Sequence, residues 1–324
     1  MTAHTIDQNT LRGAVELANR APSVHNTQPW RWLLGERTLH LYADLHRWLP
    51  ATDSDGRDLL ISCGAALHHA RVALAAAGIP TRVHRMPNPD EADHLASIEL
   101  GRGSAAEADL ALASAIPVRR TDRRPFGTWP VPLRFVVDLA VRAAIEGAVL
   151  TAVNDDQRSW LFEVIRDAEE LQTQLAGYPT ELALWSGRYA SIDGIPAANL
   201  PSGPLDPSQA ARRFTTGDIE PAVHPNDGAR LLVLGTASDD NLSHLRAGEA
   251  LSAVLLGATE LGLATCPLSQ PMEIAATRRT VRDQILHGSS SPQMVIRIGW
   301  APSGSPLRAT PRRPVRDTLD RLDG

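Results

Sequence analysis

The segment APSVHNTQPW, residues 21–30, gathers more hydrogen-bonding side chains than a simple turn needs. It directly follows a helical pattern, and the prolines near its two ends restrict the path of the backbone. The residues that we expect to form a binding loop are Ser23, Val24, His25, Asn26, Thr27 and Gln28. Hydroxyl, imidazole and amide groups in this pattern favour contact with a bound molecule, and a solvent-exposed polar turn is the alternative.

Two clusters of arginine lie far from this loop in the sequence. VRRTDRRPF, residues 118–126, contains Arg119, Arg120, Thr121 and Arg123, and ATPRRPVRD, residues 309–317, contains Arg312 and Arg313. Guanidinium groups beside a hydroxyl bind phosphate through bidentate, charge-assisted hydrogen bonds. Either cluster alone is more typical of a solvated basic linker or tail. Their combination with the polar loop favours a phosphate-binding site.

Composition and spacing exclude several other kinds of site. The sequence contains no Lys, so a P-loop is impossible, and it contains neither a GxSxG nor an HExxH motif. Cys63 and Cys266 lie far apart without CxxC spacing, and we interpret both as buried small residues rather than metal ligands or a disulfide. The acidic segment TDSDGRD, residues 52–58, lacks the ligand spacing of a calcium loop and is interpreted as a helix entry with an Asp or Ser as N-cap.

The overall composition is that of a globular protein, with 43% hydrophobic and 21% charged residues and a net charge of -5 over 324 residues. This charge disfavours nucleic acid as a partner. No apolar run long enough to span a bilayer is apparent, and the start of the chain lacks a basic segment followed by an apolar one. We therefore expect a cytoplasmic protein that binds neither membrane nor nucleic acid.

Two pairs of helical segments repeat within the chain. LRGAVELANRA, from Leu11, matches LRFVVDLAVRA, from Leu133, and GAALHHARVALAAAGI, from Gly64, matches GEALSAVLLGATELGL, from Gly248. Short strand patterns occur at residues 39–45, 97–100, 148–153, 230–236 and 293–300, and Trp30 and Trp32 alternate along a further strand. The pattern predicts a layered α+β or α/β chain made of two related half-units.

The second half-unit is enlarged by an insertion at about residues 160–229. Its middle combines Trp185 and Tyr189 with a dense run of Pro and Gly. Long irregular segments of this kind are either lids or ordered surface loops, and the sequence leaves both open.

Four motifs together resemble those of nitroreductase-fold flavoproteins. APSVHNTQPW resembles the family's polar loop, RRTDRRPF its arginine segment, LGLATCPLSQ the segment behind the flavin, and RRPVRDTL its C-terminal arm. In this order they identify the chain as similar to the actinobacterial Acg-type NAD(P)H nitroreductases. The resemblance covers nearly the whole chain. It implies an α+β, nitroreductase-like fold with antiparallel or mixed sheets surrounded by helices.

The resemblance also implies how the site is assembled. Ordinary members are homodimers whose FMN lies at the subunit interface, whereas here the polar loop belongs to the first half (1–108) and the other three motifs to the second (109–324). We expect one chain to act as a pseudo-dimer that binds one FMN. NAD(P)H and a small electrophilic acceptor would be its reaction partners, with hydride passing through flavin N5. Flavin chemistry of this kind assigns no catalytic side chain and no metal.

Residue roles follow from the same resemblance. Arg119, Thr121 and Arg123 would contact the phosphate, ribityl chain and pyrimidine edge, and Arg313 with Arg312 would complete the phosphate clamp. Arg120 belongs to the same arginine segment. Ser23 and Asn26 would contact the flavin, with Val24, His25, Thr27 and Gln28 shaping the loop. The segment behind the flavin comprises Pro267, Leu268, Ser269 and Gln270.

One position departs from the family pattern. Gln270 stands where many members have a Gly whose backbone approaches N5, and its side chain would alter flavin reactivity or crowd the nicotinamide. The departure and the insertion together raise an alternative function, an FMN-sequestering or storage protein with little or no turnover. A degenerate scaffold without flavin is a third hypothesis.

Overall fold

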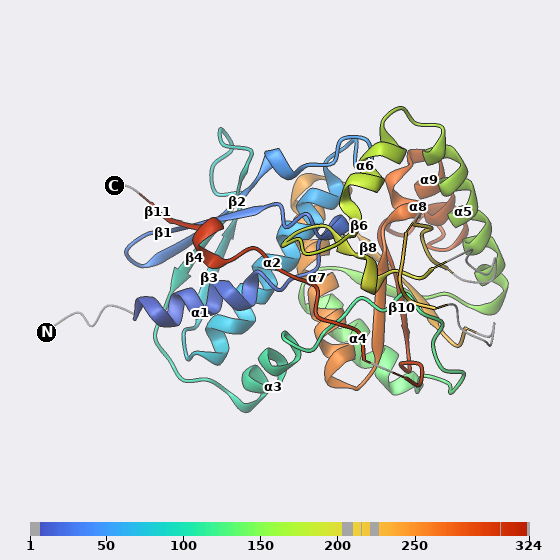
Figure 1. Ribbon diagram of the computed structural model, residues 1–324. Helices are drawn as coiled ribbons and strands as arrows, with labels where there is room; N and C mark the ends of the chain where they lie inside the picture. Colours follow the sequence, from blue (N-terminus) through green and yellow to red (C-terminus); the bar gives the residue numbers. More distant parts are fainter. Residues whose placement is uncertain (1–6, 203–209, 215, 221–226, 305, 323–324) are drawn as a thin grey trace, which may run out of the picture.

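The computed structural model describes residues 7–202, 210–214, 216–220, 227–304 and 306–322. Figure 1 shows two lobes, each built on a sheet, with the long helices α2 (Arg57–Ala76) and α7 (Asn241–Glu260) between them. The fold is α+β, as the sequence predicted.

The first lobe is built mainly from the N-terminal third of the chain. Its elements are α1 (Gln8–Ala18), β1 (Trp30–Leu34), β2 (Thr38–Ala43), β3 (Thr81–Arg85), β4 (His94–Leu100) and the short helices η1 (Val24–Asn26) and η2 (Leu45–Arg47). The strand order is β11-β1-β2-β4-β3, and β11 (Leu319–Arg321) runs parallel to β1. The C-terminal arm therefore returns to the first lobe, which it reaches beside α1 (Figure 1).

The second lobe repeats this arrangement. It contains α3 (Glu107–Ala115), α4 (Leu133–Ile145), β5 (Val149–Ala152), β8 (Arg230–Thr236), β9 (Ala264–Leu268), α8 (Gln270–Glu273), α9 (Ala275–Gln284) and β10 (Ser291–Gly299). Its strand order, β5-β8-β10-β9, matches β1-β2-β4-β3, and every pairing within both sets is antiparallel. α2 and α7 occupy corresponding places along the chain, because α2 lies between β2 and β3 and α7 lies between β8 and β9.

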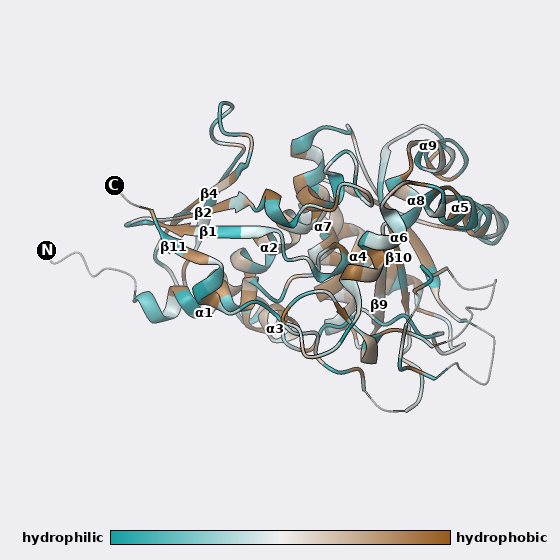
Figure 2. Ribbon diagram, turned by 45° about the horizontal axis from the view of Figure 1, so that its top comes forward, coloured by the Kyte–Doolittle hydropathy of each residue, from teal (hydrophilic) through white to brown (hydrophobic). Residues whose placement is uncertain are grey.

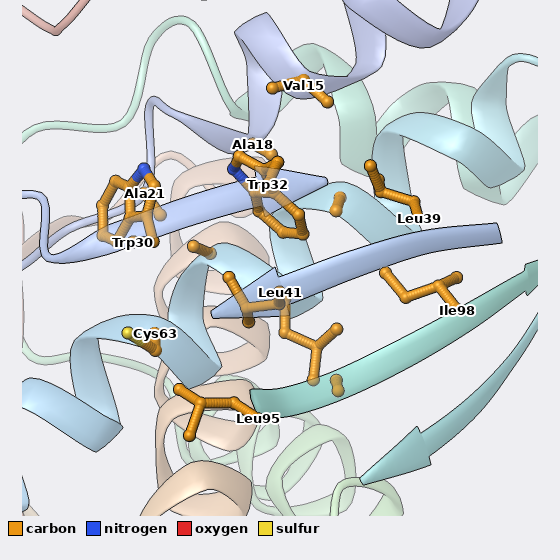
Figure 3. Close-up of a cluster of buried hydrophobic side chains, with 14 of the residues drawn as sticks. Val15, Ala18, Ala21, Trp30, Trp32, Leu39, Leu41, Cys63, Leu95 and Ile98 are labelled. Carbon is orange, nitrogen blue, oxygen red and sulfur yellow. The ribbon is translucent and has the colours of Figure 1, made fainter. Parts of the chain in front are cut away.

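Apolar residues that recur at regular spacing in the sequence form the core of the first lobe. Trp30 and Trp32 alternate along β1, so both point to the same face, and both are fully buried. Figure 3 shows them packed between α1 and the sheet, near Val15 and Leu41. Their indole N–H groups both donate to Asn19, at 2.9 and 3.3 Å between the nitrogen and Oδ1 atoms, which satisfies the polar edge of each ring.

α2 and α7 cross at two glycines, one from each helix. A methyl group on Gly64 would collide with the backbone carbonyl of Leu245, and one on Gly248 would collide with that of Ile61. These contacts are reciprocal, because 61 and 64 in α2 correspond to 245 and 248 in α7. One turn further on, His68 Nδ1 lies 2.7 Å from Ser252 Oγ, again a pair of corresponding positions. The two helical backbones touch, so the lobes are held at a fixed distance.

α2 is also long and apolar enough to cross a membrane by length and composition. However, 83% of its apolar window is buried inside the protein, as is usual for a core helix. Figure 2 shows the apolar residues concentrated where α2, α7 and the sheets meet, whereas the outlying α5 and α9 are more hydrophilic.

The insertion is more regular than the sequence indicated. Between β5 and β8 the chain forms α5 (Asp155–Thr173), α6 (Tyr178–Trp185), a small parallel pair of β6 (Ser186–Arg188) and β7 (Ile195–Pro196), and η3 (Ala197–Asn199). Trp160 therefore lies inside a helix, and the insertion begins earlier than residue 160, directly after β5. Residues 203–209, 215 and 221–226 of the insertion lie outside the described part of the chain. The acidic segment before α2 also differs from its prediction, since the N-cap is Gly56, in the left-handed region at φ 70°.

The glycine crossing predicts a specific loss of stability. Gly64→Ala should lower the free energy of unfolding by about 1–3 kcal/mol or more, because the new methyl group must push two backbones apart. Gly13→Ala in α1 is the matched control, since nothing lies within 4 Å of the place that its new methyl group would take and alanine favours a helix by about 0.5–1 kcal/mol. Chemical denaturation measures both. Equal stability of the two variants would contradict a close crossing.

Candidate functional site

A cavity of about 1200 Å³ of empty space, open solvent included, lies where the two lobes meet. It is walled by the polar loop, the first turns of α2, the arginine segment, the end of β9, the C-terminal arm and the insertion. The predicted site residues that line it are Ser23, Val24, His25, Asn26, Arg119, Arg120, Thr121, Arg123, Pro267, Leu268, Ser269 and Arg312. The fold thus brings together four motifs that are far apart in sequence.

The polar loop is held in an unusual backbone conformation. His25, Asn26 and Gln28 have φ angles of 46°, 57° and 53°, in the left-handed region that few residues other than Gly adopt. Side chains fix this path, since Ser23 Oγ accepts a hydrogen bond from the Gln28 backbone at 2.9 Å and Ser62 Oγ accepts one from Val24 at 3.1 Å. Clusters of strained residues are typical of binding sites, where the surrounding contacts stabilise them.

The loop amides bind other parts of this chain. Asn26 Nδ2 donates to the carbonyl of Gly194 at 2.9 Å, and Gln28 Nε2 donates to that of Ile192 at 2.9 Å. Gln28 Oε1 accepts from the Arg313 backbone at 2.8 Å. Thr27 bonds within the loop, to Val24. Thr27 and Gln28 do not line the cavity, whereas Asn26 Oδ1 is buried and has no partner among the described residues.

Two guanidinium groups, of which Arg119 is buried and Arg312 partly buried, give the cavity its charge. Arg119 and Arg312 have nitrogen atoms (Nε and Nη1 of the first, Nε of the second) that are buried without a partner among the described residues. Burial, followed by the charge of Arg120, lowers the pKa of Arg119 to about 10. Burial, followed by the charges of Arg119, Arg20 and Arg120, lowers the pKa of Arg312 to about 9. The described residues place no carboxylate in an ion pair with this group, so the site is suited to an anion.

Arg313 is not among the residues that line this cavity, so the phosphate role predicted for it stays a prediction. Its Nη1 donates to the Gln28 carbonyl at 3.1 Å, and its Nη2 donates to the Asp317 carbonyl at 2.7 Å. Arg312 instead lines the cavity, and its Nη2 donates to the carbonyls of Arg20 and Ala21, both at 3.1 Å, while its Nε is buried without a partner among the described residues. Neighbouring residues on an extended arm point in opposite directions, so only one of the two arginines faces the site.

Gln270 also lies outside the cavity lining. Its side chain is 1% exposed and donates to Gln172 Oε1 of α5 at 2.9 Å. The crowding predicted for this position therefore does not arise from its side chain, because the tertiary structure draws it into the protein interior.

The insertion contributes residues that the motifs did not reveal. The ring of Phe214 lies edge-on to His25, with 6.3 Å between the ring centroids, and the guanidinium of Arg123 lies 5.4 Å from the Phe214 ring centroid. Arg212 is buried, donates to Tyr178 at 2.8 Å and pairs with Glu273. Burial, followed by the charges of Arg212 and Arg123, lowers the pKa of His25 well below its usual value, so the imidazole is neutral. Only the ARRF composition of residues 211–214 marked this contribution in the sequence.

α2 supplies a second set of lining residues that the sequence did not indicate, Asp58, Ile61 and Ser62. They lie at the first turns of the helix, where its N-terminus reaches the floor of the cavity. Their periodic spacing is ordinary for a core helix, so nothing in the sequence distinguished them from packing residues.

Comparison with known proteins identifies the family. No family model matches the chain. It is 44% identical over 331 residues to a Mycobacterium tuberculosis protein named "Putative NAD(P)H nitroreductase Rv3131", covering 99% of this chain and 94% of that protein. It is 38% identical over 324 residues to "Putative NAD(P)H nitroreductase acg" of the same organism, covering 97% and 96% of the two chains. The chain belongs to the Acg-type family of NAD(P)H nitroreductases, which confirms the family inferred from the four motifs.

Solved structures give partial matches. The FMN-dependent nitroreductase NfnB of Mycobacterium smegmatis, determined with NADPH, is 16% identical, with a TM-score of 0.44 over 67% of this chain and all of its own. An FMN-bound nitroreductase from Bacteroides fragilis is 15% identical, with a TM-score of 0.40 over 61% of this chain and 91% of its own.

The crowded guanidinium groups predict that anions stabilise the protein. Inorganic phosphate at about ten times its Kd should raise the free energy of unfolding by about 1.4 kcal/mol, because a ligand that binds only the folded state stabilises it by mass action. Arg312→Ala should lose most of this increment, whereas Arg313→Ala should retain it, since only Arg312 faces the cavity. Thermal unfolding in phosphate against sodium chloride of equal ionic strength measures the difference. An unchanged phosphate effect in Arg312→Ala would exclude this anion site.

Proposed function

We propose that this protein binds FMN in the cavity between its lobes and acts as an NAD(P)H-dependent oxidoreductase of the nitroreductase type. The observation that carries the proposal is the pair of guanidinium groups of Arg119, which is buried, and Arg312, which is partly buried. Both residues line the cavity, and both have nitrogen atoms without a partner among the described residues. A phosphate monoester supplies the acceptor oxygens and negative charge that these groups lack. The names of the curated relatives support the reaction class.

The residues present fit each part of the cofactor. Arg119 and Arg312 would bind the phosphate, with the Thr121 hydroxyl beside them. His25 and Phe214 offer flat, uncharged surfaces to the aromatic ring of a bound cofactor. Arg123 offers a cation to the edge of that bound ring. When bound, the flavin supplies hydride transfer to an electrophilic acceptor, and the protein supplies position, charge and exclusion of water.

We further propose that the chain is an internal duplication that acts as a pseudo-dimer, with halves at 1–108 and 109–324. The matching strand orders and the reciprocal contacts at Gly64 and Gly248 support this, because self-complementary contacts are the mark of a two-fold interface. The returning β11 ties the end of the second half to the first. A cytoplasmic location is part of the same proposal and rests on the sequence alone.

The proposed duplication relates the cavity to a second place in the chain, and the residues at that second place support one FMN per chain. By the offset that relates Gly64 to Gly248, Ser269 at the cavity corresponds to Arg85. The Arg85 guanidinium pairs with the buried Glu249 at 2.6 Å, and Arg71 joins Glu249 to Glu146. A cluster of ion pairs therefore occupies the place of a second cofactor.

One observation favours the alternative, FMN sequestration with little turnover. Residues 192–194 of the insertion are fastened to the polar loop by the Asn26 and Gln28 amides, and Asp193 pairs with Arg47 at 3.1 Å. Ile195, Ala211 and Phe214 of the same insertion line the cavity. An insertion held in this way would restrict the access of NAD(P)H and acceptor.

Anaerobic absorbance spectroscopy tests the proposed function. Protein reconstituted with FMN should hold one flavin per chain, and NADPH should bleach the flavin band if the protein is a reductase. Bound flavin that dithionite bleaches but NADPH and NADH do not would support sequestration instead. Failure to retain FMN, or a ratio near two, would contradict the cofactor proposal.

The ion pair between Arg47 and Asp193 predicts faster flavin release when it is removed. Asp193→Ala should raise the dissociation rate of FMN roughly fivefold, since a partly buried ion pair of this kind contributes about 1 kcal/mol. Asp167→Ala, in the exposed face of α5, is the matched control. Stopped-flow mixing with an apoflavodoxin trap measures both rates. Identical rates would mean that the insertion does not retain the flavin.

A further inference from the structure

Asp58 lines the cavity, and its buried Oδ2 has no hydrogen-bond partner among the described residues. It is in the first turn of α2 and is 4% exposed. Its backbone carbonyl accepts from Ser62 Oγ at 2.5 Å, so the helix holds the backbone of Asp58 in the cavity wall.

The cations around Asp58 are already paired with other carboxylates. Arg57, on the same helix, pairs with Asp239 and donates to Gln293 at 2.7 Å. Arg212, from the insertion, pairs with Glu273 of α8. Neither guanidinium makes a hydrogen bond to Asp58 among the described contacts.

The neighbouring acid, Asp53, has the stabilisation that Asp58 lacks. Its two carboxylate oxygens accept from the backbone N–H groups of Asp58 and Leu59, at 3.0 and 2.9 Å. The negative charge of Asp53 is therefore stabilised by two backbone hydrogen bonds, and that of Glu273 by its ion pair with Arg212. Asp58 has neither kind of contact, so a bound proton is what offsets the cost of burying its carboxyl group.

We propose that Asp58 is a neutral carboxylic acid that donates a hydrogen bond, and then its proton, to an oxygen of an uncharged nitroaromatic substrate in the cavity. The substrate named in this proposal rests on the proposed function, whereas the protonation state of Asp58 does not. It adds a proton donor to a site whose motifs supply only cofactor contacts.

The surrounding charges agree with this assignment. Burial, followed by the negative charges of Asp53 and Glu273, raises the pKa of Asp58 well above its usual value, against the smaller opposing effects of Arg57 and Arg212. His25, another titratable residue that lines the cavity, is neutral. Asp53 itself has a pKa raised to about 6, chiefly by burial.

The proton completes the chemistry of nitro reduction. A bound reduced flavin, or a dihydronicotinamide, would supply a hydride with its two electrons and become oxidised, and the nitro group would be reduced to a nitroso group. One N–O bond breaks, and the departing oxygen leaves as water, with the hydride hydrogen and the Asp58 proton. The Asp58 carboxylate then recovers its proton from water.

The protonation state is tested on the protein without flavin. Infrared difference spectra of wild type and Asp58→Asn at neutral pH should show a protonated carboxyl band that the variant lacks and the control Asp55→Asn keeps, since Asp55 is largely exposed. Because the folded state holds the Asp58 proton more tightly than the unfolded state, the stability of wild type relative to Asp58→Asn should fall as the pH rises above about 4. Asp58→Asn should then be as stable as wild type or more so at neutral pH. A carboxylate band from Asp58 at neutral pH would overturn the proposal.

The donor role is tested with 4-nitrobenzamide on FMN-loaded protein. Asp58→Asn keeps a hydrogen-bond donor but no transferable proton, so the substrate Kd should stay close to wild type while kcat falls by about 100-fold or more. Asp58→Ala should also weaken binding, and Asp55→Asn should change neither. Unchanged kcat in Asp58→Asn would overturn proton donation. If wild type shows no turnover, the proposed reductase function is wrong. Equal binding of 4-nitrobenzamide by wild type and Asp58→Ala would separately overturn the donor role of Asp58.

Discussion

The contact between the backbones of α2 and α7 sets the geometry on which the cavity depends. With glycine at both crossing positions, the helices approach until each meets a carbonyl of the other, and the sheets they carry are fixed in relation to one another. Closely packed backbones cannot slide without losing contacts across the whole interface. The cavity walls include both helices, because Asp58, Ile61 and Ser62 come from α2 and Leu251 from α7.

Charge in this cavity is arranged unevenly. Arg119, which is buried, and Arg312, which is partly buried, both have lowered pKa values, and an anion would relieve their repulsion. Asp58, which also lines the cavity, is buried near Asp53 and Glu273 and has a raised pKa. A molecule that carries both an anionic group and an uncharged aromatic part, such as a flavin nucleotide, would suit this combination of groups.

The polar loop and the insertion depend on each other. The left-handed conformations at His25, Asn26 and Gln28 are costly for residues with side chains, and contacts from residues 192–194 and the C-terminal arm stabilise them. The loop therefore has two tasks, since Ser23, Val24, His25 and Asn26 line the cavity while the Asn26 and Gln28 amides hold the insertion. Access to the site and the shape of the site are coupled for this reason.

The sequence by itself determined the principal elements of the two lobes and the motifs that form the site, but not the helices of the insertion. Its periodicity marked both long helices, the principal strands and the paired tryptophans, and its four motifs indicated the family. Only the tertiary structure decided which side chains face the cavity. Arg312 enters it and Arg313 does not, Gln270 turns inward to Gln172, and Asp58 is left without a cation because Glu273 binds Arg212. Local spacing fixes secondary structure, but the orientation and charge of a buried side chain depend on partners brought from distant parts of the chain.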